Sequence, residues 1–231
     1  MNFAFSCCRY KCCSAEKKQE ARVPQSEIGH VYDKLAGIYD VWGVLTESRA
    51  RNRAIELAKI ENGMNVLEVA VGTGLAFYEM VKRNPNGKNT GIDLSKGMLK
   101  KAEKRLKKLS GANFTLSTGT AFNLPMEDET VDVLMNNYMV DLMSEADMDK
   151  VLMEFRRVLK EHGRLVMVNM TMGERFGSNI YNYVYNISPK LMGGCRGVTL
   201  SGKLKDHGFQ VETREYYQQL LFPSEVNLAH K

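Results

Sequence analysis

The sequence has 231 residues, of which 44% are hydrophobic and 26% are charged, a size and composition that suit one globular α/β domain with a single core. Its net charge of +5 allows attraction to an anionic surface or an acidic ligand but gives no reason to expect a nucleic-acid partner. No apolar run approaches the roughly 20 residues that cross a bilayer, and no Cys/His spacing indicates a zinc finger, so we expect neither a transmembrane helix nor a bound metal.

Residues 1–27 are predicted to form a tail outside the domain, which then occupies 28–231. Four of the five cysteines lie in this tail: Cys7, Cys8, Cys12 and Cys13. Three interpretations stay open, namely a disordered extension, a membrane-facing tail with acylated cysteines, and a four-thiolate metal site. Because the tail lacks the apolar stretch of a secretory signal, we expect a cytoplasmic protein, with peripheral contact at a membrane as the alternative that the cysteines suggest.

Strand-like and helix-like segments alternate from residue 31 onward, as judged from the spacing of their apolar residues. Ser95 and Ser144 are placed to cap the helices that follow them, and Gly163 is placed to end the second of these helices. In chain order we predict a helix over 49–60, a strand over 65–70, a helix around 77–81, a strand over 90–94, a helix over 95–109, a strand around 114–116, a strand over 131–135, a helix from 144 to 163, and a strand over 164–170.

The end of the chain has a different pattern. Two strand-like runs, 211–217 and 226–229, are joined by a short link that contains Pro223, which is typical of an antiparallel hairpin. Strands separated by helix-length segments indicate a parallel sheet with helices on both faces. The whole pattern predicts an α/β, Rossmann-like, doubly wound fold, with a mostly parallel seven-stranded sheet and a C-terminal antiparallel hairpin.

The most informative stretch follows the first predicted strand and reads EVAVGTGL, residues 68–75. Gly72 and Gly74 lack a Cβ, so they allow a ligand to approach the backbone closely. In an open α/β sheet, ligands bind beyond the carboxyl ends of the strands, where this loop lies. Asp93 ends the second strand about 20 residues further on, at the spacing of an acid that accepts hydrogen bonds from ribose hydroxyls.

Two classes of nucleotide cofactor fit this layout, and the residues separate them. A dinucleotide fingerprint has a third glycine where this chain has Phe77. A pyrophosphate also gains nothing from a carboxylate such as Glu68 at the strand end, whereas the sulfonium and α-amino groups of S-adenosylmethionine suit an acid. The loop therefore favours S-adenosylmethionine over a nicotinamide cofactor, and a turn that serves only packing is the third interpretation.

Five segments carry a family resemblance: VYDKLAGIYD (31–40), VLEVAVGTGL (66–75), TGIDLSKGML (90–99), TAFNLPMEDETVDVL (120–134) and FRRVLKEHGRLVMVN (155–169). They resemble the class I S-adenosylmethionine-dependent methyltransferases, in particular the group that holds the ubiquinone and menaquinone biosynthesis methyltransferases and the bacterial phosphatidylethanolamine N-methyltransferases. The resemblance covers the chain from about Val31 to the C-terminus. It implies methyl transfer from S-adenosylmethionine without identifying the acceptor.

The resemblance also implies roles for single residues. Asn137 starts the loop after the fourth strand, beneath the transferable methyl group, and is expected to act in both cofactor binding and catalysis. Tyr32 and Tyr39 lie in an N-terminal segment that the resemblance places over the cofactor. Tyr32 is expected to bind the cofactor, and Tyr39 is expected to act in catalysis by closing the site and excluding water; anchoring a helix is their alternative role. The other expected cofactor-binding residues are Glu68, Ala70, Gly72 and Gly74 for the methionine part, Asp93 for the ribose, and Leu94, Met98, Thr120 and Ala121 for the adenine.

The chain departs from the family's pattern at several positions. Ala70 stands where the first glycine is usual, and Thr120 stands where an acid is usual. The triplet 161–163 replaces a Pro-Gly-Gly, and Asn169 replaces an acid at the end of the fifth strand. These departures weaken the likeness to the quinone methyltransferases and leave the lipid-amine type as a comparable match.

Residues 172–194 are longer than an ordinary helix-to-strand link and are interpreted as a lid over the acceptor. Apolar residues recur there at helical spacing beside Tyr181 and Tyr185, which are expected to bind the acceptor, with ordinary core packing as the alternative. No general base stands out in the sequence, which favours an amine or a thiol over a phenol. We predict a methyltransferase for a small apolar or lipid-like acceptor (a phospholipid amine, a quinol or a thiol), and the alternative is a non-catalytic S-adenosylmethionine-binding regulatory protein.

Overall fold

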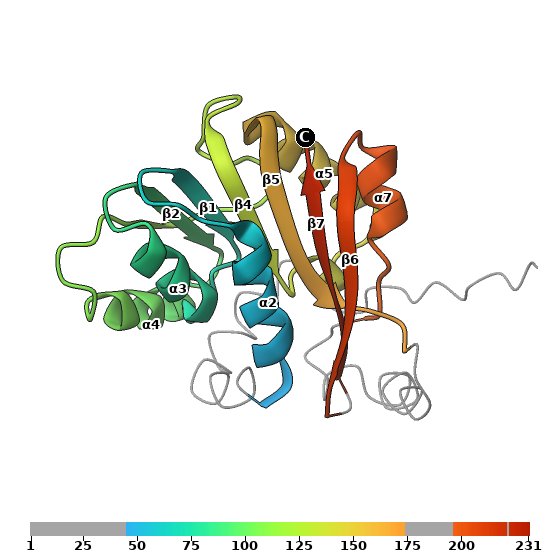
Figure 1. Cartoon of the computed structure of the whole chain (residues 1–231), viewed down its shortest axis with the longest axis horizontal. Coiled ribbons are helices and arrows are strands. Elements are labelled where there is room, and N and C mark those ends of the chain that lie inside the picture. Colours follow the sequence, from blue (N-terminus) through green and yellow to red (C-terminus); the bar gives the residue numbers. More distant parts are fainter. Residues whose placement is uncertain (1–44, 174–195, 221) are drawn as a thin grey trace, which may run out of the picture.

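The computed structural model describes residues 45–173, 196–220 and 222–231. In these residues a seven-stranded sheet is flanked by helices on both faces (Figure 1). The predicted α/β, doubly wound architecture is confirmed. Several predictions fall outside the described residues: those for the tail 1–27, for nearly all of the lid 172–194, and for Tyr32, Tyr39, Tyr181 and Tyr185.

The strands of the sheet follow the order β3-β2-β1-β4-β5-β7-β6. They are β1 (Asn65–Val69), β2 (Lys88–Asp93), β3 (Thr115–Thr118), β4 (Val131–Asn137), β5 (Leu159–Met170), β6 (Gln210–Gln219) and β7 (Phe222–His230). β1 to β5 are parallel, and β7 runs antiparallel to both β5 and β6. The direction of strand progression reverses between β1 and β4, and such a switch point is where open α/β sheets bind ligands.

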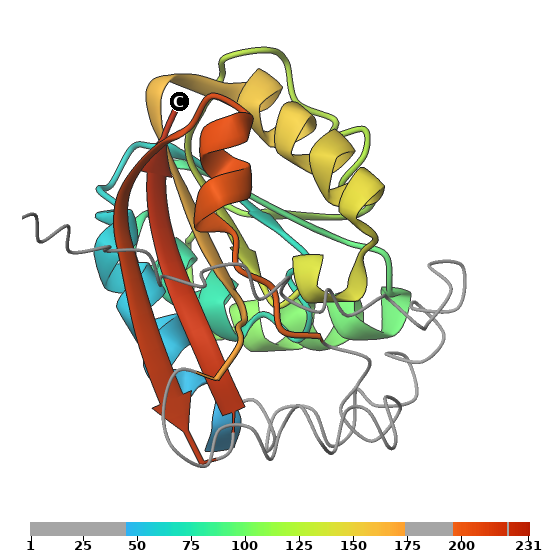
Figure 2. The same cartoon turned by 90° about the vertical axis from the view of Figure 1, so that its right-hand side faces the viewer.

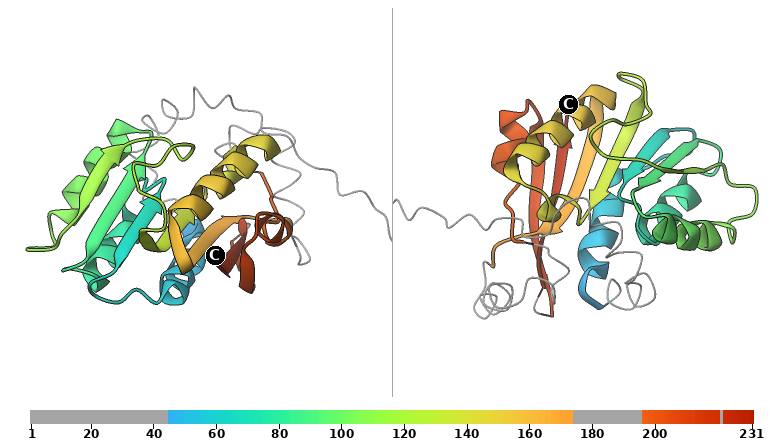
Figure 3. Two further views of the ribbon diagram at one scale, coloured as in Figure 1. Left: turned by 90° about the horizontal axis from the view of Figure 1, so that it is seen from above. Right: turned by 180° about the vertical axis from the view of Figure 1, so that it is seen from behind.

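Helices cover the two faces of the sheet in separate groups (Figure 2, Figure 3). On one face lie α2 (Ser48–Ala58), α3 (Leu75–Arg83) and α4 (Lys96–Leu106); on the other lie α5 (Glu145–Val158) and α7 (Ser201–Asp206). Side chains alternate along each strand, so in β1 Val66 packs with the first group while Leu67 and Val69 pack with the second. The short 3-10 helix η1 (Val140–Leu142) follows β4.

Two helices begin where the sequence predicts. The Ser95 hydroxyl accepts a hydrogen bond of 3.0 Å from the Met98 amide, and the Ser144 hydroxyl accepts one of 3.2 Å from the Asp147 amide. Each bond satisfies a backbone donor that has no partner inside the helix. Ser95 thereby sets the start of α4, directly after the strand that ends in Asp93.

The prediction that Gly163 ends the helix after Ser144 is wrong. α5 ends at Val158, and β5 starts at Leu159, which pairs with Val131 of β4. Val158 and Leu159 are both fully buried, so burial in the sheet ends the helix earlier than the distant glycine would. Gly163 itself lies inside β5. The register of β5 against β4 shifts at this point, because Leu159 pairs with Val131 whereas Arg164 pairs with Val133.

The C-terminal hairpin is confirmed, but its strands are longer than predicted and Pro223 is not in the link. Pro223 lies in β7, opposite Gln218 of β6. It is the second residue of the strand. Its carbonyl oxygen accepts a hydrogen bond of 3.0 Å from the Thr171 amide, which ties the hairpin to the end of β5.

In the part of the chain that the structure describes, no helix is long and apolar enough to cross a membrane. The same residues contain no group of three or more His, Cys, Asp or Glu side chains arranged to hold a metal ion.

Candidate active site

The loop after β1 takes a left-handed path through three residues. The φ angles are 63° at Ala70, 57° at Gly72 and 78° at Gly74. A Cβ on Gly74 would lie 2.9 Å from the Ala102 Cβ of α4, so only glycine allows the loop to pack on that helix. A Cβ on Gly72 would meet no atom within 4 Å, so the space beside it is open. Ala70 keeps its Cβ in a conformation that costs a non-glycine residue about 1 to 2 kcal/mol.

Asp93 holds this loop against β2. Its two carboxylate oxygens accept hydrogen bonds of 2.7 Å from the Gly72 amide and 2.8 Å from the Ser95 amide. On the other side, the Arg105 side chain of α4 donates to the Thr73 carbonyl oxygen over 3.0 Å. Because a carboxylate can accept about four hydrogen bonds, Asp93 can fix the loop and still receive hydroxyl groups from a ligand.

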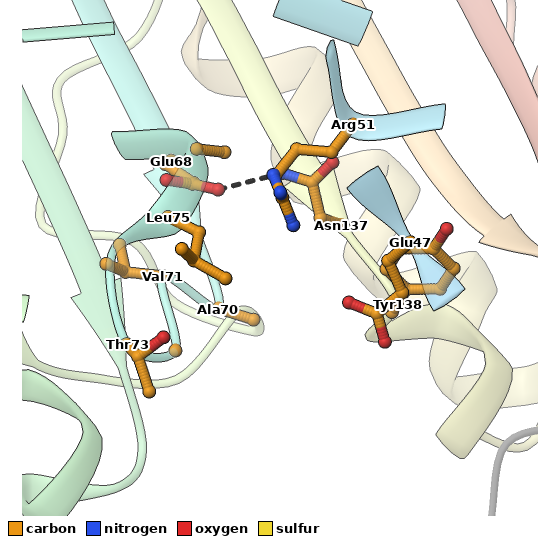
Figure 4. A pocket seen from close by; sticks show the side chains of 11 residues that line it. Glu47, Arg51, Glu68, Ala70, Val71, Thr73, Leu75, Asn137 and Tyr138 are labelled. Atoms are coloured by element: carbon orange, nitrogen blue, oxygen red, sulfur yellow. Dashed lines mark hydrogen bonds between the residues drawn. The ribbon is translucent and has the colours of Figure 1, made fainter. Parts of the chain in front are cut away.

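Glu68 and Asn137 meet where β1 and β4 end. The Asn137 side-chain amide donates a hydrogen bond of 2.8 Å to Glu68 Oε1 (Figure 4). The other oxygen, Glu68 Oε2, is buried and accepts no hydrogen bond from the described residues, and the same holds for Asn137 Oδ1. Burial raises the pKa of Glu68 to about 8, although the Asn137 hydrogen bond and the positive charge of Arg51 lower it. Each of these two hydrogen-bonded side chains therefore keeps a buried acceptor atom, which suits a cationic donor group.

A pocket opens between this loop and a second wall made by Glu47, Arg51 and Tyr138 (Figure 4). Arg51 projects from α2, Glu47 precedes that helix, and Tyr138 follows β4. The Tyr138 backbone has a φ of 52°, and its amide donates to the Val168 carbonyl oxygen over 2.7 Å. Its hydroxyl lies 2.9 Å from the Ser224 hydroxyl, so both ends of this residue are fixed against the sheet.

Sequence reasoning missed all three residues of the second wall. Glu47 and Arg51 are four positions apart, a spacing that brings two residues to one side of a helix, but only the packing of α2 on the sheet brings them to the loop. Tyr138 directly follows Asn137, which the sequence did single out. That adjacency was the one usable signal.

The residues expected around the adenine are placed differently from one another. Leu94 directly follows β2 and is 47% exposed, whereas Met98 and Ala121 are buried. The Thr120 hydroxyl accepts a hydrogen bond of 3.3 Å from the Phe122 amide. None of these four residues lines the pocket between Glu68 and Tyr138, and their role toward adenine stays a prediction.

Residues 60–205 match the family of the methyltransferase domain. The chain belongs to this family. A demethylmenaquinone methyltransferase from Thermotoga maritima is 32% identical to the chain over 170 residues, which are 71% of each protein. This methyltransferase therefore uses S-adenosylmethionine, as the glycine loop predicts, and the relative is named as an enzyme rather than as a regulatory binding protein.

Solved structures of other proteins share the fold of this methyltransferase. The geranyl diphosphate C-methyltransferase of Streptomyces coelicolor, in complex with S-adenosyl-L-homocysteine, superposes with a TM-score of 0.65 at 13% identity and covers 80% of this chain and 79% of its own. The [4+2]-cyclase SpnF superposes with a TM-score of 0.68 at 18% identity, covering 88% and 94%. Because a protein named as a cyclase shares this fold, the fold alone does not establish methyl transfer.

S-adenosylmethionine fits the residues of the pocket. Its amino-acid end carries an ammonium and a carboxylate, and the pocket offers two unsatisfied acceptor atoms, on Glu68 and Asn137, together with the guanidinium of Arg51. The open space beside Gly72 leaves room for a ligand that lies along the loop.

Proposed function

We propose that the methyltransferase acts on a small apolar or lipid-like acceptor, with a phospholipid amine, a quinol and a thiol as the candidates. The observation that carries the proposal is the pocket at the switch point, where polar acceptor atoms lie opposite the ring of Tyr138 and beside the apolar side chains of Val71 and Leu75. Demethylmenaquinone and geranyl diphosphate, the compounds in the names of two similar proteins, support an acceptor of this kind.

On this proposal the cofactor lies along the loop side of the pocket and reaches Arg51 of the second wall. Glu68 and Asn137 would receive the ammonium, Arg51 would pair with the carboxylate, and Asp93 would accept the ribose hydroxyls. Gly72, Gly74 and Ala70 would lie along the methionine part. Leu94, Met98, Thr120 and Ala121 would contact the adenine.

Bound S-adenosylmethionine supplies a methyl group on a sulfonium, which is already a good leaving group. The residues of the chain therefore act mainly by holding the two reactants in line, and alignment of this kind is a large source of catalysis. Tyr138 suits that task because its ring is buried and both its backbone and its hydroxyl are fixed.

An acceptor series tests the proposal. Three series of acceptors, namely quinols, amines and thiols, are compared by kcat/KM for methyl transfer. Within each series the head group is constant and the alkyl chain becomes longer. We expect activity to rise with chain length, because each buried methylene group contributes about 0.8 kcal/mol, or roughly fourfold. Equal activity on the shortest polar members would contradict an apolar acceptor.

Tyr181 and Tyr185 give a second test, since the sequence predicts that they bind the acceptor. Tyr181→Ala and Tyr185→Ala should each raise the KM of the acceptor and leave the affinity for S-adenosylmethionine unchanged. Equal losses for both ligands, together with a lower melting temperature, would instead assign these residues to ordinary packing.

A further inference from the structure

Glu47 places a buried carboxylate in the pocket. The residue is 8% exposed and lines the second wall, beside Tyr138 and across the pocket from Ala70 and Val71 (Figure 4). Its carboxylate forms no hydrogen bond with any other described residue. The carboxylate therefore forms part of the pocket wall, where a bound ligand can reach it.

The charged and titratable groups around Glu47 come from several elements. Arg51 of α2 lies one turn further along, and its amide donates to the Glu47 carbonyl oxygen over 3.0 Å. Asp141 of η1 and Tyr138 also face it, and Glu68 lies across the pocket. Burial raises the pKa of Glu47 to about 7; Arg51 lowers it and Asp141 raises it further. A carboxyl group in this range can take up a proton near neutral pH, which an ordinary surface carboxylate does poorly.

We propose that Glu47 is the general base of the methyl transfer and that the acceptor presents an aromatic hydroxyl group to it. This inference rests on the proposed function, because it assumes that the acceptor enters the pocket on the side of Tyr138. The hydroxyl proton passes to a carboxylate oxygen of Glu47. The electron pair released on the acceptor forms the new bond to the methyl carbon, and the bond from that carbon to sulfur breaks with its electrons remaining on sulfur.

The chemistry of the other candidate acceptors suits Glu47 less well. A carboxylate beside an amine stabilises the ammonium form, which has no lone pair for attack. A thiol has a pKa of about 8.5 and ionises near neutral pH without a base of this kind. A phenol has a pKa of about 10 and stays neutral at pH 7, so it gains most from a base.

The test compares Glu47→Gln and Glu47→Asp with a matched control, Glu56→Gln, which removes an exposed carboxylate of α2. Two acceptors are used: an alkylated hydroquinone, and an alkylated nitrophenol that is already ionised at pH 8. For the hydroquinone we expect Glu47→Gln to lower kcat/KM by about 100-fold or more, and Glu47→Asp to restore part of the loss. For the nitrophenol we expect a much smaller loss, because it needs no base.

The pH profile gives a readout that a structural role would not change. In the wild type and in Glu56→Gln, kcat/KM for the hydroquinone should rise with pH through about 7, and in Glu47→Gln this dependence should vanish. Equal losses on both acceptors with the pH dependence retained would overturn the assignment of the base. Methylation restricted to amines or thiols would overturn it too, while leaving the proposed function intact. A wild type that methylates no member of the acceptor series would contradict the proposed function itself.

Discussion

The two walls of the pocket face each other, but the sequence specifies them differently: one is a continuous segment and the other is assembled from separate segments. The loop wall, 68–76, is one continuous stretch in which backbone conformation does most of the work, with three residues at positive φ. The second wall takes Glu47, Arg51 and Tyr138 from segments that only the fold brings together. The loop wall is thus specified largely by a local motif, whereas the second wall depends on tertiary packing.

The largest expected effect on stability comes from a change in the loop wall alone. Gly74→Ala places a Cβ 2.9 Å from the Ala102 Cβ in a left-handed conformation, so we expect a loss of about 2 to 4 kcal/mol in the free energy of unfolding. Gly72→Ala is the matched control, because it has the same strain but open space, and it should cost about 1 to 2 kcal/mol. Urea denaturation measures both, and equal losses would mean that packing on α4 does not hold the loop.

A second change loosens the same wall at Asp93. Asp93→Ala removes the acceptors of the Gly72 and Ser95 amides, and we expect the affinity for S-adenosylmethionine to fall by about 1 to 3 kcal/mol. Calorimetric titration measures this affinity. An unchanged dissociation constant would remove the ribose assignment.

The buried acids in and beside the pocket should make the ligand-free protein less stable as the pH rises. Burial raises the pKa values of Glu68, Glu47 and Asp141 to about 8, 7 and 7, so the folded state holds protons that the unfolded state releases at lower pH. The free energy of unfolding should therefore fall between about pH 5 and pH 8, by up to about 1.4 kcal/mol per pH unit for each carboxyl group that stays protonated only in the folded state. Glu68→Gln should flatten this decline in urea titrations at pH 5.5 and pH 8. Stability that rises with pH over this range would contradict the raised pKa values of these buried acids.

The smallest expected effect concerns Ala70. Ala70→Gly relieves the strain of a Cβ at a φ of 63° but makes the unfolded chain more flexible, so the net change should stay below about 1 kcal/mol in favour of the variant. Urea denaturation measures it. A clear loss of stability would show that the Ala70 side chain packs in a way that outweighs its conformation.

The two walls also differ in how far the sequence reveals them. The loop positions of Gly72 and Gly74 and the place of Asp93 at the end of β2 were predictable from spacing within a strand-loop-helix unit. Glu47 was not, because its importance comes from burial near Tyr138 and Asp141, which are distant in the sequence. Gly163 misled the prediction for the same reason: burial of the start of β5 in the sheet, a tertiary effect, outweighed the local signal of a glycine.

The most direct test of the two-wall account is the affinity for S-adenosylmethionine in Glu68→Gln and Glu47→Gln, measured side by side by calorimetry, with Glu79→Gln of α3 as a surface control. We expect Glu68→Gln to weaken binding by about 1 to 3 kcal/mol, because it removes the charge that would face the ammonium. Glu47→Gln and Glu79→Gln should bind like the wild type. Binding that is weakened by Glu47→Gln as strongly as by Glu68→Gln would contradict the account, because both carboxylates would then belong to the cofactor.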